Sequence, residues 1–220
     1  MVEISTSVLT VPKDKIIKTI YNLEVAKTDY FHIDVMDGKF VENFTNEIME
    51  EYCGYMKSIS NIPLDVHLMV TDIKKYIDIY LNYEPNIITF HIEAVKNKDE
   101  AIELIKYIKS NNCKVGIAIK PNTNITKLYE ILDYVHMVTI MTVEPGKGGQ
   151  TLISKTVEKI KELKKYIDDN NIDIDIEADG GIKIENVNMV KDAGANIIVS
   201  GSGIVNSENY TDVINKMKNE

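Results

Sequence analysis

Short apolar runs rich in Val and Ile alternate with longer amphipathic stretches along the whole chain. Runs that are apolar at nearly every position are typical of strands buried on both faces of a parallel sheet. No Ser/Gly-rich or Pro-rich linker interrupts the alternation. The pattern predicts strands at Glu3–Leu9, Tyr30–Met36, Leu64–Met69, Ile87–His91, Lys114–Ile119, His136–Met141, Asp173–Ala178 and Asn196–Ser200.

The stretches between these runs have helical spacing. Ser154–Asp168 is the clearest case, because its apolar residues recur every three to four positions against a Lys/Glu face: Val157, Ile160, Leu163 and Ile167. Asp72 precedes IKKYIDIYL and Ser207 precedes ENYTDVINKM, and we expect both to act as helix N-caps.

Eight strand-then-helix units within 220 residues predict a single (β/α)8 TIM barrel of the α/β class that spans residues 1–220. The pattern leaves one alternative open, a doubly wound open sheet. In a barrel, catalytic residues lie at the C-terminal ends of the strands. The polar residues near those ends are therefore the candidates for function.

The charge of the chain limits its partners. It carries 25 basic and 34 acidic residues, for a formal net charge of -9, and every basic residue is Lys. This charge offers no attraction to nucleic acid or to an anionic membrane, so we expect neither as a partner. Without Arg, any anion site must use backbone amides, helix ends or Lys.

The cysteines and the N-terminal segment indicate the compartment. Cys53 and Cys113 lie far apart without CxxC spacing, which predicts free buried thiols in a reducing environment. Residues 1–15 lack a basic segment followed by an apolar one, and no apolar run approaches ~20 residues. We therefore expect a cytoplasmic protein without a membrane span.

Ionisable candidate residues lie within or just after three of the predicted strands. In the second and third strands they alternate with other residues and so share one face of each strand: His32, Asp34, Met36, Asp65, His67 and Met69. One such residue is more often a hydrogen-bonded core residue than a ligand, but two successive strands with the same pattern favour a cluster. A divalent cation would offset the cost of burying these groups. Asp179, after the seventh strand, supplies a further carboxylate.

Glycine-containing turns follow the last three predicted strands, at residues 144–150, 179–182 and 200–204. Glycine allows the backbone to approach a ligand closely, and the loops after strands seven and eight of such barrels often bind phosphate. In a chain without Arg, three such turns favour an anion site, and residues 142–150 could close over it as a lid. His91 and Glu93 could line the floor of the barrel or support the site, and we favour support. We expect His136 to be structural.

These segments resemble the ribulose-phosphate 3-epimerase family nearly from end to end. The resemblance rests on an ordered series of motifs: STSVL, HIDVMDGKFVENFT, LDVHLMV, FHIEA, VGIAIKP, VTIMTVEPGKGGQ, IEADGGI and IIVSGSGI. It implies a ribulose-phosphate-binding barrel that holds one divalent ion per chain, most often Zn²⁺, with Fe²⁺, Mn²⁺ or Co²⁺ as alternatives. It also implies a homo-oligomer.

The resemblance assigns roles to individual residues. It implies that Asp34 and Asp179 are the acid and base on opposite faces of the substrate, and that they bind the metal together with His32 and His67. The implied substrate contacts also include His67, and the remainder are Ser7, Met36, Met69, Met141, Gly146, Lys147, Gly148, Gly149, Gly180, Gly181, Gly201 and Ser202.

The chain departs from the family pattern at three positions. Thr6 and Glu42 stand where the family usually has Pro, and Lys147 stands where it usually has an aromatic residue between the lid glycines. None of these changes removes a ligand or an acid/base group. They bear on loop geometry and substrate preference rather than on reaction type.

The chemistry of the residues agrees with the resemblance. Inverting a carbon next to a ketone requires an acid on one face and a base on the other, which two carboxylates from different strands can supply. A divalent ion would stabilise the enediolate, and uncharged Met side chains would exclude water. The implied reaction interconverts D-ribulose 5-phosphate and D-xylulose 5-phosphate in the pentose phosphate pathway.

Two other functions remain open at this stage. One is the 3-epimerisation of a hexulose phosphate such as D-allulose 6-phosphate, and the other is non-catalytic binding of a phosphate metabolite. Related barrels that act through a Lys in an Asp-x-Lys-x-x-Asp strand are disfavoured, because no predicted strand carries this motif.

Overall fold

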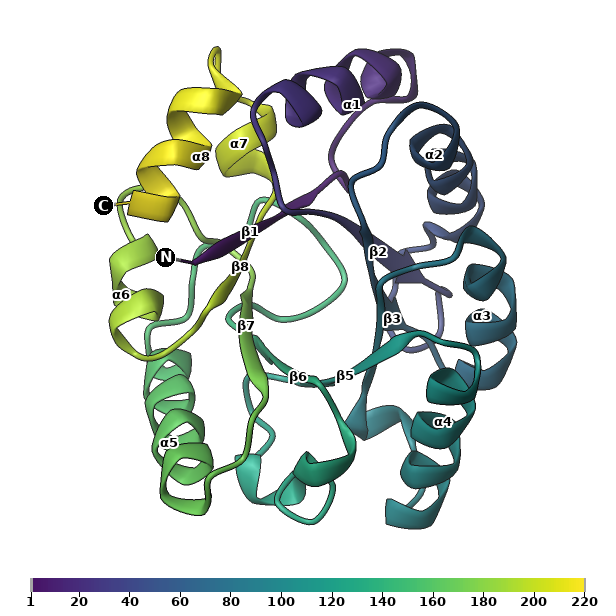
Figure 1. Ribbon diagram of the computed structural model, residues 1–220, viewed down its shortest axis with the longest axis vertical. Coiled ribbons are helices and arrows are strands. Elements are labelled where there is room, and N and C mark those ends of the chain that lie inside the picture. The colour runs from purple at the N-terminus through teal and green to yellow at the C-terminus, as the bar shows by residue number, and fades with distance from the viewer. Residues whose placement is uncertain (1, 220) are drawn as a thin grey trace.

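Eight parallel strands close into a barrel in the computed structural model, which describes residues 2–219 (Figure 1). Each strand pairs with the next along the chain, and the last pairs with the first. The (β/α)8 prediction is therefore confirmed, and the open sheet is excluded. The strands are β1 (Glu3–Ser7), β2 (Tyr30–Met36), β3 (Leu64–Met69), β4 (Ile87–His91), β5 (Lys114–Ile119), β6 (Met137–Met141), β7 (Asp175–Asp179) and β8 (Ile197–Ser200).

The helices form a ring around the barrel (Figure 1). Between β5 and β6 two 3-10 turns, Ile125–Lys127 and Leu132–Tyr134, take the place of an α-helix. Buried apolar residues of this segment, such as Leu128 and Ile131, still cover the barrel there. The helices are α1 (Ile16–Val25), α2 (Asn46–Ile59), α3 (Ile73–Tyr80), α4 (Lys98–Ser110), α5 (Lys155–Asn170), α6 (Val187–Asp192), α7 (Ser202–Val205) and α8 (Tyr210–Asn219).

The predicted helix starts had different outcomes. Asp72 caps α3, because its carboxylate accepts a hydrogen bond from the Lys75 amide at 3.3 Å. The Ser207 prediction is wrong. Asn209 accepts from the Asp212 amide at 3.1 Å at the start of α8, whereas the Ser207 hydroxyl donates to the Ile204 carbonyl of α7. The residue that caps α8 is therefore Asn209, two positions after Ser207.

Several strand ends differ from the prediction by one or two residues. The first strand ends at Ser7, because the chain turns there and the Val11 amide bonds back to the Val8 carbonyl. The seventh begins at Asp175 and includes Asp179. This change places the Asp179 carboxylate on the last strand residue rather than in the following loop.

The interior of the barrel is layered. Residues that alternate along each strand point inward, so the first inward residues of β4, β6 and β8 form a small apolar cluster: Ile87, Met137 and Ile197. A polar layer lies above it, with Ser5, Asp65, Thr139 and Glu177 all buried. The large apolar core fills the space between strands and helices instead. The apolar cluster and the polar layer therefore lie below His67 and Asp179, which are nearer the C-terminal mouth of the barrel.

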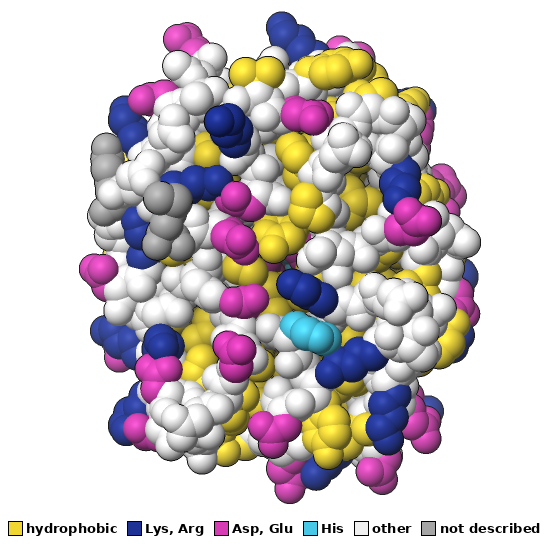
Figure 2. Space-filling view, in the orientation of Figure 1, with side chains coloured by type: hydrophobic (Ala, Val, Ile, Leu, Met, Phe, Trp, Pro, Cys, Tyr) yellow, Lys and Arg dark blue, Asp and Glu magenta, His cyan; other side chains and the backbone are white. Residues whose placement is uncertain are grey.

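Charges of both signs are interspersed over the face shown in Figure 2, with acidic side chains gathered near its centre. Cys53 and Cys113 are free and buried, as predicted. Among residues 2–219, no helix has the length and apolar character needed to cross a bilayer.

Candidate active site

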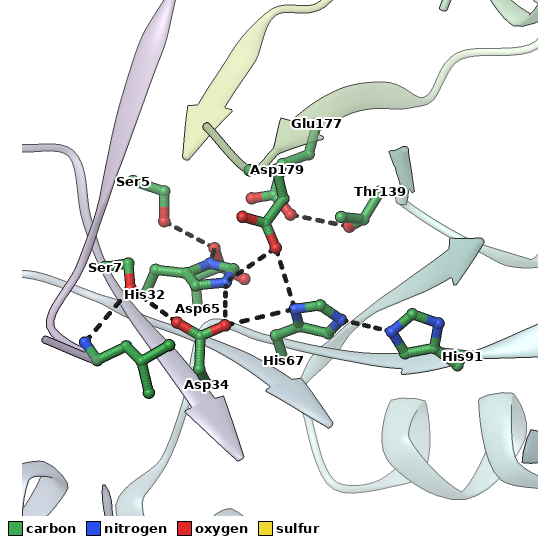
Figure 3. A network of polar contacts seen from close by, with 12 residues as sticks. Ser5, Ser7, His32, Asp34, Asp65, His67, His91, Thr139, Glu177 and Asp179 are labelled. Atoms are coloured by element: carbon green, nitrogen blue, oxygen red, sulfur yellow. Dashed lines mark hydrogen bonds and ion pairs between the residues drawn. The ribbon is translucent and has the colours of Figure 1, made fainter. Parts of the chain in front are cut away.

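Four ionisable side chains converge at the C-terminal end of the barrel (Figure 3). His32 and Asp34 come from β2, His67 from β3 and Asp179 from β7. His67 Nδ1 lies 3.3 Å from Asp179 Oδ2 and 3.8 Å from Asp34 Oδ1. His32 Nε2 lies 3.5 Å from Asp34 Oδ1 and 3.7 Å from Asp179 Oδ2. The four residues predicted as ligands are thus brought together around one point.

This arrangement fits a metal ion. Ligands about 2.0–2.2 Å from a tetrahedral ion stand about 3.3–3.6 Å apart, close to the distances seen here. Three of the four atoms are buried without any hydrogen-bond partner: His32 Nε2, His67 Nδ1 and Asp179 Oδ2. Buried polar atoms rarely remain unpaired. The four residues, which we call the ligand cluster, could therefore hold a divalent cation.

A carboxylate holds His32 from behind. Its Nδ1 lies 2.6 Å from Asp65 Oδ2, which also accepts a hydrogen bond from the Ser5 hydroxyl at 2.7 Å. Burial would lower the pKa of His32, but the carboxylates of Asp65 and Asp34 raise it well above its usual value. Asp65 thereby fixes which ring nitrogen faces the ligand cluster.

Glu177 lies in the layer below the ligand cluster. Its Oε1 accepts a hydrogen bond from the Thr139 hydroxyl at 2.8 Å, and the side chain is 1% exposed. Burial and the neighbouring Asp65 carboxylate raise the pKa of Glu177 well above its usual value. This shift favours the uncharged form of the Glu177 carboxyl, which reduces repulsion with the adjacent Asp65 carboxylate.

His67 is also held from the side away from the ligand cluster. Its Nε2 lies 2.9 Å from His91 Nε2, and His91 Nδ1 lies 3.1 Å from Glu93 Oε2. Burial lowers the pKa of His91 to about 4, so its ring is neutral. Burial would raise the pKa of Glu93, but its hydrogen bonds, first among them that from His91, lower it to about 2.

Asp34 joins the ligand cluster to the first strand. Its Oδ1 faces the cluster, while its Oδ2 accepts a hydrogen bond from the Ser7 hydroxyl at 2.7 Å. Burial would raise the pKa of Asp34, but His32, His67 and Ser7 together lower it. This carboxyl is therefore ionised at neutral pH.

A cavity that opens to solvent lies over Asp34 and Asp179, which are among its lining residues. Met36 and His67 are not among its lining residues, since they are 1% and 0% exposed. The other residues predicted to contact substrate do line it: Ser7, Met69, Met141, Gly146, Lys147, Gly148, Gly149, Gly180, Gly181, Gly201 and Ser202.

The glycines after β7 are required by their surroundings. Gly180 has φ +122°, and a Cβ there would lie 2.3 Å from a methyl carbon of Val143. Gly181 has φ +68°, and its Cβ would lie 2.5 Å from the Leu152 amide nitrogen. Any larger residue would push the segment after β6 away from the end of β7.

The segment after β6, residues 142–150, is held by one contact from a neighbouring loop and by two of its own. The Asn43 side-chain amide donates to the Gly146 carbonyl at 2.7 Å, which joins this segment to the loop after β2. The Gln150 side-chain amide donates to the carbonyls of Glu144 and Lys147 at 2.7 and 2.8 Å. The predicted lid is therefore an ordered turn over one side of the cavity.

Two residues that build the site, Glu177 and Phe40, were not predicted from the sequence. Glu177 precedes Asp179 by two positions, so the alternation used for the second and third strands would have placed both on one face. Nothing local indicated that the Phe40 ring packs against His91, with ring centres 4.9 Å apart. His136 has the structural role expected, because its Nδ1 accepts a hydrogen bond from the Val115 amide at 3.1 Å.

Comparison with known proteins identifies relatives of this chain. It is 37% identical over 199 residues to ribulose-phosphate 3-epimerase of Escherichia coli (strain K12), covering 89% of this chain and 85% of that protein. It is 34% identical over 208 residues to ribulose-phosphate 3-epimerase of Serratia marcescens, covering 94% and 97%. The chloroplastic ribulose-5-phosphate-3-epimerase of Arabidopsis thaliana is 33% identical over 215 residues, covering 98% and 75%.

Solved structures share the fold at low sequence identity. A 3-hexulose-6-phosphate synthase superimposes with a TM-score of 0.72 at 12% identity, covering 98% of each chain. KGPDC from Streptococcus mutans gives a TM-score of 0.72 at 10% identity, covering 99% of this chain and 96% of that one. The model of the ribulose-phosphate 3 epimerase family matches residues 3–205. This chain therefore belongs to the ribulose-phosphate 3 epimerase family.

Proposed function

We propose that this protein is an enzyme that interconverts D-ribulose 5-phosphate and D-xylulose 5-phosphate by moving a proton at C3. The observation that carries this proposal is the pair Asp34 and Asp179 at the base of a cavity lined by glycine turns. The two carboxylates come from β2 and β7, which lie three strands apart around the barrel. They therefore reach a bound substrate from different sides, as inversion requires.

The chain's own residues supply the steps around this proton transfer. One carboxylate removes the C3 proton from one face, and the other donates a proton to the opposite face. The hydrogen bond from Ser7 orients the Asp34 carboxyl, while Met69 and Met141 present side chains to the cavity without a competing donor or acceptor. The glycine turns bring backbone amides near the cavity, which suits them to receive the phosphate of the substrate.

We propose that the ligand cluster holds one zinc ion per chain. Two imidazoles and two carboxylates suit zinc, although iron, manganese or cobalt would accept the same donors. Atom separations near those of a tetrahedral site support this choice. When bound, the cation supplies a Lewis acid for negative charge that develops on the substrate oxygens.

Purified protein incubated with D-ribulose 5-phosphate in D2O tests the reaction. We expect deuterium at C3 of both sugars, and a much lower rate with D-allulose 6-phosphate. Asp34→Asn and Asp179→Asn should each reduce kcat on the order of 10²-fold or more, whereas the exposed carboxyl variant Asp192→Asn should not. Faster turnover of the hexulose phosphate would favour the alternative substrate, and absence of turnover with either would leave a non-catalytic binder.

We also propose that the chain forms a homo-oligomer through α1. Ile17, Tyr21 and Val25 are exposed and recur every four residues along this helix. A second copy related by a two-fold axis at Tyr21 sets Ile17 against Val25 and Lys18 against Glu24, so apolar and charged pairs both match. Sedimentation velocity should show a dimer that Tyr21→Glu dissociates and Tyr134→Glu, at another exposed tyrosine, does not. A wild-type monomer would contradict this.

We propose that the protein is cytoplasmic. Two unpaired, buried thiols support a reducing setting such as the cytoplasm.

A further inference from the structure

A line of hydrogen bonds leads from His67 away from the ligand cluster (Figure 3). His67 Nε2 meets His91 Nε2 at 2.9 Å, and His91 Nδ1 meets Glu93 Oε2 at 3.1 Å. The second oxygen of Glu93 accepts hydrogen bonds from the Lys120 amide at 2.8 Å and from the Thr123 hydroxyl. The line therefore ends on the backbone just after β5 and runs across β3 and β4.

With a neutral His91 ring, the hydrogen bonds of this line point in one direction. The Glu93 carboxylate accepts and cannot donate, so His91 Nδ1 must carry a proton. A neutral imidazole has one N–H, which leaves His91 Nε2 as an acceptor. His67 Nε2 must then be the donor, which leaves the lone pair of His67 Nδ1 for a cation bound between it and the carboxylates of Asp34 and Asp179. In the reverse direction, His91 Nδ1 and Glu93 Oε2 would oppose their lone pairs at 3.1 Å.

Water cannot replace either hydrogen-bond partner of His91, because this side chain has no exposed surface. The Phe40 ring covers it, with ring centres 4.9 Å apart, and the Lys120 ammonium lies 3.9 Å from the centre of the Phe40 ring. A hydrogen bond that is lost in such a dry place leaves a buried donor unpaired, because no water can replace the lost partner. The arrangement of His67 is thus set by groups that lie beyond it.

We propose that His91 and Glu93 are positioning residues, which hold His67 in the tautomer and ring orientation that a cation requires. This inference rests on the proposed cation site and assigns a role to two residues that touch neither the cation nor the cavity. Partners of this kind commonly change metal affinity 10- to 100-fold when altered. Glu93 would act on His67 through two successive hydrogen bonds, by way of His91.

The decisive variant is Glu93→Gln, which keeps the size of the side chain. If its NH2 faces His91, His91 Nδ1 must accept, the line reverses, and His67 Nδ1 gains a proton where the cation should sit. If the NH2 faces the Lys120 amide instead, two donors oppose each other. His91→Phe keeps a ring but removes the acceptor for His67. We expect both variants to bind Zn²⁺ 10- to 100-fold more weakly in competition with a chelator.

Cobalt gives a readout apart from activity. We expect the visible absorption of Co²⁺ in the ligand cluster to weaken or shift in both variants, whereas Glu185→Gln, at an exposed glutamate, should match the wild type. Wild-type affinity and an unchanged Co²⁺ spectrum in both variants would overturn the positioning role. Wild-type protein that binds no metal would overturn the cation site instead.

A measurement on the unaltered protein covers the case in which the variants fail to fold. In zinc-loaded wild-type protein labelled with ¹⁵N-histidine, we expect the NMR shifts of His91 to report a proton on Nδ1, the nitrogen that meets Glu93, and none on Nε2. A proton on His91 Nε2 would overturn the inference.

Discussion

At the scale of single residues, the site depends on which atom of each side chain faces the ligand cluster. His32 and His67 use different ring nitrogens, Nε2 and Nδ1, and each is held at its other nitrogen by a neighbouring strand. Strand register brings this about, because His32 lies opposite Asp65 and Asp34 lies opposite His67 in the β2–β3 pairing. The donors are therefore oriented before any ligand binds.

The first prediction concerns His67. His67→Ala removes one of four converging donors, so the protein should lose most of its bound metal, which elemental analysis after dialysis would measure. His136→Ala is the matched control, because that imidazole lies outside the ligand cluster and bonds the Val115 amide. Equal metal content in the two variants would show that the ion binds elsewhere.

At the scale of elements, the loops after the strands are tied to one another by short polar contacts. Asp37, just after β2, accepts hydrogen bonds at Oδ1 from the amides of Lys39 and Phe40 at 2.9 and 2.8 Å. Its Oδ2 accepts from the amide and the hydroxyl of Thr71, both at 2.7 Å. One carboxylate thus shapes its own loop and fastens it to the loop after β3.

Asp37→Asn should destabilise the protein by about 1–3 kcal/mol at pH 7, because the new NH2 must face a donor. Burial would raise the pKa of Asp37, but its hydrogen bonds, first that from the Thr71 amide, lower it. A lowered pKa stabilises the fold above the unfolded value of about 3.9, and this contribution fades as the pH falls further. Chemical denaturation should therefore show a smaller difference in the free energy of unfolding between wild type and Asp37→Asn at pH 3 than at pH 7. A gap that does not depend on pH would exclude this role of the charge.

Lys147 lies exposed in the turn after β6, which hydrogen bonds from Asn43 and Gln150 hold in place. If its ammonium attracts the substrate phosphate, Lys147→Met should raise KM several-fold and flatten the dependence of KM on salt, because salt screens exposed charges. Steady-state kinetics at several ionic strengths would measure both. Lys161→Met, on the outer face of α5, is the control, and an unchanged KM in Lys147→Met would leave Lys147 a solvated residue.

At the scale of the whole molecule, closure of the barrel depends on how its inward side chains fit. Thr89 and Gly116 lie opposite each other in the β4–β5 pairing, and a Cβ at Gly116 would come 2.1 Å from Thr89 Oγ1. That hydroxyl is buried without a partner. The glycine therefore leaves room for a threonine that gains no hydrogen bond there.

Gly116→Ala should destabilise the barrel by about 1–3 kcal/mol through overpacking, as measured by chemical denaturation. Thr89→Ala removes the hydroxyl and methyl groups that lie 2.1 and 3.2 Å from the added Cβ, so the double variant should recover much of that loss, and the two effects should be strongly non-additive. If the losses of stability in the two single variants simply add in the double variant, then the effect of Gly116→Ala does not depend on Thr89.

The sequence by itself determined the barrel and most of its site. Buried strands have a recognisable apolar pattern, and period-two alternation placed the polar residues of β2 and β3 on one face, so the ligand cluster was predictable. Helix starts were less certain, as Ser207 shows, because Ser and Asn near a helix start can bond several nearby backbone groups.

Only the tertiary structure decided how strands distant in sequence meet. Asp179 joins His67 because the barrel closes, and the pairing of His91 with His67 depends on the stagger between strands, which no local pattern encodes. The same holds for Phe40 against His91 and for Asn43 against Gly146. A sequence specifies which groups are buried, whereas the direction of a hydrogen bond between two of them depends on all the groups packed around both.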